Sequence, residues 1–594
     1  MSYRYADAER IQELRMERFA GVDFSSDPTK VDAIRSPDAC NMIGDEAGFP
    51  CKRTGYVCEE EMDAPIYGLH RMDDELLIHA GSNLYSRKGE NLSLLCSKMN
   101  TARSQSFRMN GKLWILDGMA YRVYDGTECV PVREKAFVPT TTIGAPPSGG
   151  GTSFEAVNML TPYRINTFVG DGVTKTFQLD TTNFDAGSIS CEGQTVYAFN
   201  RAKGTVTFTE PPPDGEGLAN VVIRFAKTVP EHADKIDRCR ICGLYGGSND
   251  TRVFVSGDPQ EPNCDWQSGL YDPTYFPDTG YTKVGVDSTA IVGYLRQYDN
   301  QIVLKEDGQD AKQYLRSFAL DENNRAAYSL KQGAEAVGAL SAYALGELEG
   351  TPLYLSAEGV MGVFGTNVSE QRVISCMSER VNRRLLREAG RKDAAGCVWK
   401  GRYYLAVNDH CYVADGRQRS NGVPEWYYWD NIPATCFLAE EDALWFGTQD
   451  GRVCRFCTEE EADAYLDDGA AICAHWSTPL SALGSWNDTK NVLSMIPVLM
   501  PFARSSAEVL WKTERESGIA ESVSMTRFCF SDLDFTRFVF QTSISASPVP
   551  VRQRQRRAYL FQGIVRNDKA KEPFGLLGLS IRYTVRAPVR KIGG

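Results

Sequence analysis

The sequence predicts a mostly β protein: a β-propeller of about six or seven blades, with an inserted small β-sandwich and a C-terminal β-sandwich-like domain. Three observations lead to this fold class. A strand–turn–strand unit recurs seven times, a Pro/Gly/Ser-rich stretch interrupts the series before a separate set of short strands, and a different strand pattern follows Trp476.

The recurring unit is clearest in Ser106–Gly126, where an Asn110-Gly111 turn joins two apolar-rich runs. Asn-Gly favours a hairpin because both residues tolerate positive φ. One such unit cannot bury both of its faces, so repeated units are expected to stack. The other copies are Ile66–Arg87, Arg240–Asp258, Ala290–Gly308, Ala344–Gly365, Gly396–Gly416 and Thr435–Phe456. No WD or kelch signature recurs, and a string of β-sandwiches is the alternative.

The length of 594 residues indicates roughly three to five domains. A net charge of −12 argues against a dedicated duplex-DNA-binding protein, whose phosphate contacts need a basic face. No apolar run is long enough for a membrane span and no signal-peptide core is present, so we expect folding in a cytoplasm. The 17 cysteines are then expected to be reduced, mostly buried thiols.

We expect six regions in the chain. The opening twenty residues look helical, as a docking helix or a mobile arm, and Ser369–Gly390 and Thr458–Asp468 also show helical patterns. The predicted regions are an N-terminal helix or arm with a lead-in segment (1–64), a first propeller region (65–138), a linker (139–162), the inserted β-sandwich (163–228), a second propeller region (229–475) and the C-terminal β-domain (476–594).

Two short motifs carry a family resemblance. The lead-in segment, Phe19–Tyr56, contains Asn41-Met42, Gly48 and Lys52-Arg53-x-Gly55, and the insert contains Gly170-Asp171-Gly172 followed by Phe177. The lead-in motif resembles the hub or nozzle proteins of short-tailed bacteriophages, called packaged-DNA stabilisation proteins. The insert resembles a small β-sandwich module of phage tail and fibre proteins, and the last strands also look like those of tail proteins.

This resemblance implies a structural virion protein of the tail, assembled in the host cytoplasm. It implies a ring of subunits, commonly six, that contacts portal, adaptor and other tail proteins, retains packaged DNA and lets it pass without sequence-specific binding. The alternatives are a distal baseplate protein, a receptor-binding or glycan-degrading tail protein, and a cellular propeller scaffold.

No catalytic, cofactor or metal residues are predicted. The pairs Cys239/Cys242 and Cys454/Cys457 lie too far apart for a zinc ribbon or finger and have no histidine within a few residues. No nucleophile elbow, Walker loop, HExxH or Rossmann fingerprint occurs. A glycosidase would need two carboxylates about 5–9.5 Å apart, which sequence alone does not reveal. We therefore expect a protein that is not an enzyme.

A basic cluster, Arg552-Gln-Arg554-Gln-Arg556-Arg557, stands out in an acidic chain. In a regular strand Arg552, Arg554 and Arg556 share one face. This pattern suits a solvated strand that discourages edge pairing, a subunit interface facing acidic residues such as Glu59–Glu61 or Glu459–Glu461 of a neighbour, or a contact with DNA. We take the subunit interface as the functional hypothesis.

Overall fold

A computed structural model describes residues 10–322, 324–333, 337–365, 372–502, 504–526 and 547–586. The chain divides into two compact units: Tyr67–Ala342, here the middle unit, and Met1–Ile66 with Tyr343–Gly594, here the terminal unit. Among the described residues, no helix is long and apolar enough to cross a membrane.

The middle unit carries four antiparallel four-stranded sheets, each with its strands in chain order. They are β5 (Ile66–Met72), β6 (Glu75–Ala80), β7 (Asn83–Lys88) and β8 (Asn91–Ser97); β9 (Gln105–Met109), β10 (Lys112–Leu116), β11 (Tyr121–Tyr124) and β12 (Cys129–Pro131); β21 (Ile241–Tyr245), β22 (Arg252–Ser256), β23 (Cys264–Gln267) and β24 (Tyr281–Lys283); and β25 (Ile291–Gln297), β26 (Asn300–Lys305), β27 (Gln313–Leu320) and β28 (Ala326–Gln332).

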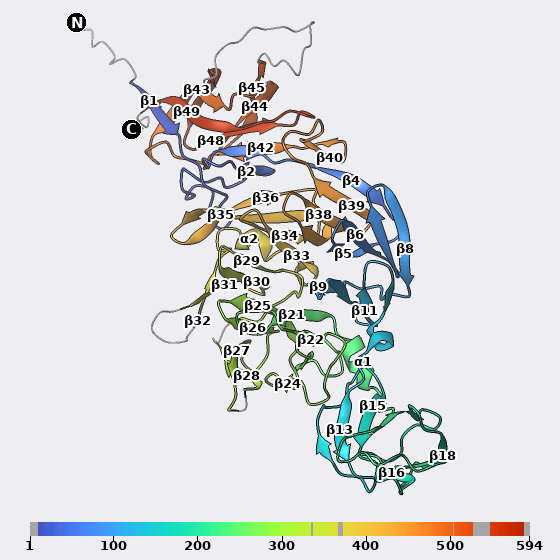
Figure 1. Ribbon diagram of the computed structural model, residues 1–594. Coiled ribbons are helices and arrows are strands. Elements are labelled where there is room, and N and C mark those ends of the chain that lie inside the picture. Colours follow the sequence, from blue (N-terminus) through green and yellow to red (C-terminus); the bar gives the residue numbers. More distant parts are fainter. Residues whose placement is uncertain are drawn as a thin grey trace, which may run out of the picture. The chain divides into compact units, whose positions relative to one another are not determined.

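The terminal unit carries three more sheets of this kind. They are β29 (Leu345–Leu348), β30 (Thr351–Ser356), β31 (Gly359–Gly365) and β32 (Arg372–Cys376); β33 (Ala395–Trp399), β34 (Arg402–Val407), β35 (His410–Ser420) and β36 (Val423–Trp429); and β37 (Ala434–Ala439), β38 (Leu444–Thr448) and β39 (Arg452–Phe456). The last sheet takes its fourth strand, β4 (Tyr56–Glu61), from the start of the chain; Figure 1 draws blue β4 beside orange β39. Beyond β4 it continues into the short strands β40 (Leu466–Asp467) and β41 (Ala470–Ala471).

These sheets are the blades of a β-propeller, as predicted, and the described residues form seven of them. The first strand of every sheet overlaps one of the seven predicted repeat units. Within each unit, first strands of consecutive sheets contact one another: β9 contacts β21 and β21 contacts β25 in the middle unit, and β29 contacts β33 and β33 contacts β37 in the terminal unit. Because side chains alternate between the two faces of a strand, a hairpin can bury apolar residues against neighbouring sheets of its own unit.

The insert between the second and third blades contains two small sheets. One contains β14 (Thr152–Ser153), β13 (Thr140–Ala145), β15 (Tyr163–Phe168), β20 (Val221–Ala226) and β17 (Ser190–Cys191); the other contains β16 (Thr176–Gln178), β19 (Thr205–Phe208) and β18 (Val196–Asn200). They share one apolar core that includes Phe168, Phe177 and Phe208. The expectation of a linker over 139–162 was partly wrong, because β13 pairs in parallel with β15 and belongs to this sandwich.

The C-terminal domain is a pair of packed sheets. The first contains β1 (Ile11–Met16), β49 (Leu576–Arg586), β43 (Thr489–Leu499) and β46 (Ser547–Pro548), with β47 (Val551–Ala558) also paired to β43; the second contains β42 (Ala474–Ser477), β48 (Phe561–Asn567), β44 (Arg504–Thr513) and β45 (Ser517–Thr526). A Cβ at Gly563 of β48 would lie 2.7 Å from Met495 Sδ of β43, so a glycine permits the close packing of the sheets.

Three helical expectations were wrong. The opening segment forms strand β1, because its thin apolar stripe pairs with β49 instead of packing as a helix. Of the segment 369–390 the structure describes residues 372–390, which form strand β32 and a one-turn helix, α2 (Asn382–Leu385), in place of the long helix expected; Ser369 lies outside the described residues. In 458–468 the Glu461 carboxylate does accept hydrogen bonds from Thr458, but the chain turns into β40.

The remaining elements are short. The lead-in segment forms a hairpin of β2 (Met42–Gly44) and β3 (Pro50–Lys52), and the helical turns are η1 (Val132–Lys135), α1 (His232–Asp237) and η2 (Arg391–Asp393).

Candidate functional site: the docked lead-in segment

The motif residues of the lead-in segment meet around a buried arginine. Arg53 follows β3, and all five of its N–H donors have acceptors: Asp467 accepts two at 2.7 Å each, Asn41 Oδ1 one at 2.9 Å, and the carbonyls of Thr54 and Asp430 one each at 3.1 and 3.0 Å. The side chain of Arg53 is 0% exposed and that of Asp467 3%. Such a fully paired buried charge fixes the segment in one position.

Asn41 is the second member of this group, which we call the Arg53 cluster (Asn41, Arg53, Asp430, Asp467). Its backbone adopts a φ of +55°, a conformation that asparagine tolerates better than most residues. Its amide nitrogen donates to Asp430 Oδ1 at 2.5 Å and to the Cys473 carbonyl at 2.9 Å. The cluster thus links the lead-in segment to the end of β36 and to β40.

The other motif residues are packing and turn residues. Met42 is buried, and Gly48 takes a φ of +89° in the β2–β3 turn. A Cβ at Gly55 would lie 1.7 Å from the Leu466 carbonyl oxygen, so only glycine fits there without a backbone shift. Lys52 Nζ donates to Asn567 Oδ1 of β48 at 2.9 Å, and burial lowers its pKa to about 8.

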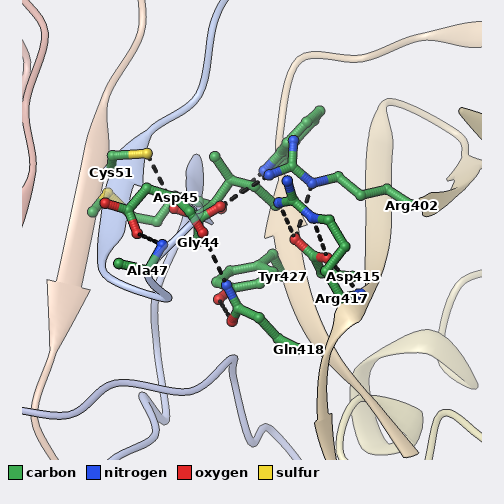
Figure 2. A network of polar contacts seen from close by, with 12 residues as sticks. Gly44, Asp45, Ala47, Cys51, Arg402, Asp415, Arg417, Gln418 and Tyr427 are labelled. Atoms are coloured by element: carbon green, nitrogen blue, oxygen red, sulfur yellow. Dashed lines mark hydrogen bonds and ion pairs between the residues drawn. The ribbon is translucent and has the colours of Figure 1, made fainter. Parts of the chain in front are cut away.

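A second polar network holds the β2–β3 hairpin against the sixth blade (Figure 2). The buried Asp415 carboxylate of β35 accepts from Arg417 Nη2 at 2.7 Å and from Arg402 Nε at 3.0 Å, and Arg402 Nη2 donates to the Gly44 carbonyl at 2.9 Å. Burial alone would raise the pKa of Asp415, but the two guanidinium groups lower it below its ordinary value. Gln418 completes the contact by donating to the Asp45 carbonyl and accepting from Tyr427.

A third buried ion pair anchors the beginning of the segment. Arg35 Nη2 lies 2.6 Å from Glu425 Oε1 of β36, and Arg380 Nη1 lies 3.1 Å from the same oxygen. Further along, the His475 imidazole lies 3.9 Å from the Asp38 carboxylate. Burial opposes protonation of His475, but Asp38 and the Cys473 thiol outweigh it and raise the pKa of His475 to about 9.

These contacts give the lead-in segment a docking role. The charged side chains of its motif, Lys52 and Arg53, are buried and hydrogen-bonded, so neither is presented to a substrate. The motif predicted Asn41 and Arg53, but sequence reasoning missed their partners, which lie hundreds of residues downstream. No local pattern marks these partners, and only co-variation between distant positions would have done so. They are Asp430 and Asp467. Two further acidic residues that hold the lead-in segment were missed in the same way: Asp415, which acts through Arg402, and Glu425, which pairs with Arg35.

The motif residues of the insert form a turn and part of a core. The Thr174 hydroxyl donates to Asp171 Oδ2, and the backbone N–H groups of Thr174 and Val173 donate to Asp171 Oδ1. Together these hydrogen bonds lower the pKa of Asp171 to about 2. Gly172 has a φ of +73°, and Gly170 N donates to Asn220 Oδ1. Phe177 is fully buried, with its ring 5.3 Å from that of Phe168.

The arginine cluster lies on β47, which pairs with β43 of the C-terminal domain. Arg552, Arg556 and Arg557 are exposed; the side chain of Arg554 lies outside the described set. Two register shifts interrupt the pairing, so Arg556 and Arg557 are both exposed and the strict alternation expected from the sequence is lost. Among described residues, none of the three exposed guanidinium groups forms an ion pair.

The two CxxC pairs are separate; Cys239, Cys454 and Cys457 are buried and Cys242 is partly buried. Cys239 lies just before β21 and Cys242 within it, while Cys454 lies in β39 and Cys457 just beyond its end. Burial raises the pKa of Cys242 to about 12 and that of Cys457 to about 11. Over the described ranges, no three His, Cys, Asp or Glu side chains gather as metal ligands would.

A cavity of about 540 Å³ lies at the base of the insert, between β15, β20 and α1. Its charges are mixed: Arg224 stacks over the Tyr163 ring at 4.7 Å, while Arg133 is paired with Asp234 and Asp237. This balance of charge favours no ligand class.

No known protein family and no curated protein matches the sequence. Solved structures with similar architecture include virginiamycin B lyase from Staphylococcus aureus (8% identity, 68% of this chain and 98% of that chain, TM-score 0.33). Others are the computationally designed Ika8 protein (10%, 68% and 99%, TM-score 0.31) and the Pan2 WD40 domain of Neurospora crassa (7%, 72% and 97%, TM-score 0.30).

Proposed function

We propose that this chain is a structural subunit of a bacteriophage tail, a ring-forming hub or nozzle that extends the DNA channel below the portal and retains packaged DNA. The observation that carries the proposal is the docked lead-in segment. Its family-type residues Asn41, Lys52, Arg53 and Gly55 all serve to fix one conformation, as a rigid scaffold under mechanical load requires.

The exposed arginines of β47 are the proposed contact with a neighbouring subunit. The whole chain carries a net charge of −12, so acidic surface is abundant on every copy. An acidic surface on a neighbouring copy is therefore the expected partner of these arginines. Exposed pairs contribute only about 0.2–1 kcal/mol each, so several would set register more than affinity.

The structure narrows the choice of acidic counterpart. Glu59 and Glu461 are already engaged within the chain by Arg455, at 3.0 Å each. Glu61, Glu459 and Glu460 are exposed and remain the better candidates in those two stretches.

Co-expression with the portal and adaptor proteins of the same genome tests the proposal. Native mass spectrometry should find a single chain in isolation and a closed ring, with six copies expected, on the portal–adaptor complex. Changing Arg552, Arg556 and Arg557 to Glu should reduce the number of bound copies while the melting temperature changes little. The same charge change at three exposed lysines elsewhere, Lys112, Lys203 and Lys283, is the matched control. One copy per complex, or equal loss in the control, would refute the ring model.

A receptor-binding or distal tail role is the second candidate, and the surface of the insert favours it. Tyr197 on the edge strand β18 is 77% exposed, and Val173 and Leu218 are 78% and 76% exposed. Exposed apolar side chains of this kind are suited to contact another surface. Binding of the full chain to host cells that is lost on Tyr197→Ser would favour this role over the nozzle.

A further inference from the structure

Two cysteines on consecutive blades face each other. Cys96 lies in β8, the last strand of the first blade, and Cys129 begins β12, the last strand of the second. Their Sγ atoms are 3.6 Å apart, in hydrogen-bond contact. A disulfide between them would require the two sulfurs to close from this distance to about 2.05 Å.

The surroundings of the two cysteines differ, and this difference sets which sulfur reacts first. Cys129 is 7% exposed and packs in the apolar core shared by the two blades, whereas Cys96 is only partly buried at its edge. The hydrogen bond between the thiols lowers the pKa of Cys96, although burial opposes this, and raises that of Cys129. Cys96 is therefore the more accessible sulfur and the one expected to react first, and Cys129 is the resolving partner behind it.

We propose that Cys96 and Cys129 form a reversible disulfide that covalently joins the first two blades when the protein meets a low-molecular-weight disulfide. The Cys96 thiolate attacks one sulfur of the oxidant, forms a mixed disulfide and expels one thiolate. The Cys129 sulfur, on losing its proton, then attacks Cys96 Sγ and expels the second. The protein loses two hydrogens, and the oxidant is reduced to two thiols.

Other cysteines in the described ranges provide internal comparisons. Cys58 of β4 and Cys454 of β39 are also direct partners across two strands, but burial raises the pKa of both thiols. Cys191 of the insert is partly buried like Cys96; it donates to the Glu192 carbonyl and has a raised pKa. The chemistry therefore favours the Cys96–Cys129 bridge over either of these.

The test is oxidation of the full-length chain with oxidised glutathione, followed by alkylation of remaining thiols and peptide mapping. Trypsin cleavage after Lys98 and Arg122 separates the two cysteines, so the bridge appears as a cross-linked peptide pair that reductant releases. We expect this pair to appear before any other, with loss of about 2 Da from the intact chain.

Three serine variants make the result specific. Cys96→Ser and Cys129→Ser should each abolish the cross-linked pair, and Cys191→Ser should leave it unchanged. Oxidation should also raise the melting temperature of the wild type by a few degrees, about what closure of such a loop predicts, but not that of Cys96→Ser. Glutathione adducts without a cross-link, or a first bridge between other cysteines, would overturn the proposal.

Discussion

Replacing Arg53 with methionine tests whether the Arg53 cluster holds the lead-in segment in place. The substitution keeps much of the side-chain volume but removes five hydrogen bonds at once. It leaves the Asp467 carboxylate buried, with the Asn431 amide as its remaining side-chain donor among the described residues.

The expected loss follows from this burial. Removing one member of a buried ion pair typically costs about 3–5 kcal/mol, because the other charge stays in a low-dielectric site. Arg53→Lys retains the charge and loses the two-pronged contact, so we expect an intermediate loss of about 1.5–3 kcal/mol. The exposed pair of Arg108 and Asp73, with 52% and 73% exposed side chains, provides the control; Arg108→Met should cost about 0.2–1 kcal/mol.

Hydrogen exchange is the suitable assay, because a chain with several domains need not unfold in one step. Peptides covering residues 38–56 and 466–477 should lose protection in Arg53→Met, while peptides of the insert should not change. If Arg53→Met and Arg108→Met lower the opening free energy of their own regions equally, the argument from burial is wrong.

Three further predictions concern pH and the insert. The raised pKa of His475 means that its contribution to stability is complete below pH 6.5 and is lost as the pH rises through about 9. The free energies of unfolding of wild type and His475→Gln, measured by denaturation across pH 6–10, should therefore differ at the low end of this range and converge at the high end. His70 and His79 share Ser104 as a hydrogen-bond partner, and burial lowers their pKa values to about 3 and 4, so stability should fall as the pH drops below 6.5; a double Gln variant should flatten this dependence in melting curves, and an unchanged slope would contradict it. A fragment of residues 139–228 should fold alone with dispersed amide resonances, whereas one of 163–228 lacks β13 and should melt at a lower temperature; equal melting temperatures would show that β13 is dispensable.

The sequence predicted those features of the fold that depend on local signals. The Asn110-Gly111 turn and the alternation around it identify a hairpin without knowledge of the rest of the chain, and both residues have positive φ in the structure. The same reasoning located the first strand of each of the seven blades that the described residues form. The thin apolar stripe of the opening segment misled it, because the identity of β1 as a strand depends on β49, at the other end of the chain.

Of the candidate site, the sequence could predict the motif residues but not the distant residues that they contact. A short motif marks Asn41 and Arg53, but Asp467 lies 414 positions after Arg53 and carries no local signature. The exposure pattern of the β47 arginines could not be predicted from the sequence either. It depends on register shifts against β43, which are set by the partner strand and not by the Arg–Gln alternation itself.

The pairing of strand β4 with β39 determines when the seventh blade can be completed during synthesis. Glu59 of β4 and its partner Arg455 of β39 are separated by 396 positions, so the seventh blade stays incomplete until nearly the whole propeller has left the ribosome. At about 5–20 residues per second, β4 waits roughly 20–80 s for its neighbour. During this interval its backbone donors and acceptors are open to other nascent chains. The three consecutive glutamates that end β4, Glu59–Glu61, would repel the same strand of a second nascent chain. This repulsion would disfavour β4–β4 pairing between chains during synthesis.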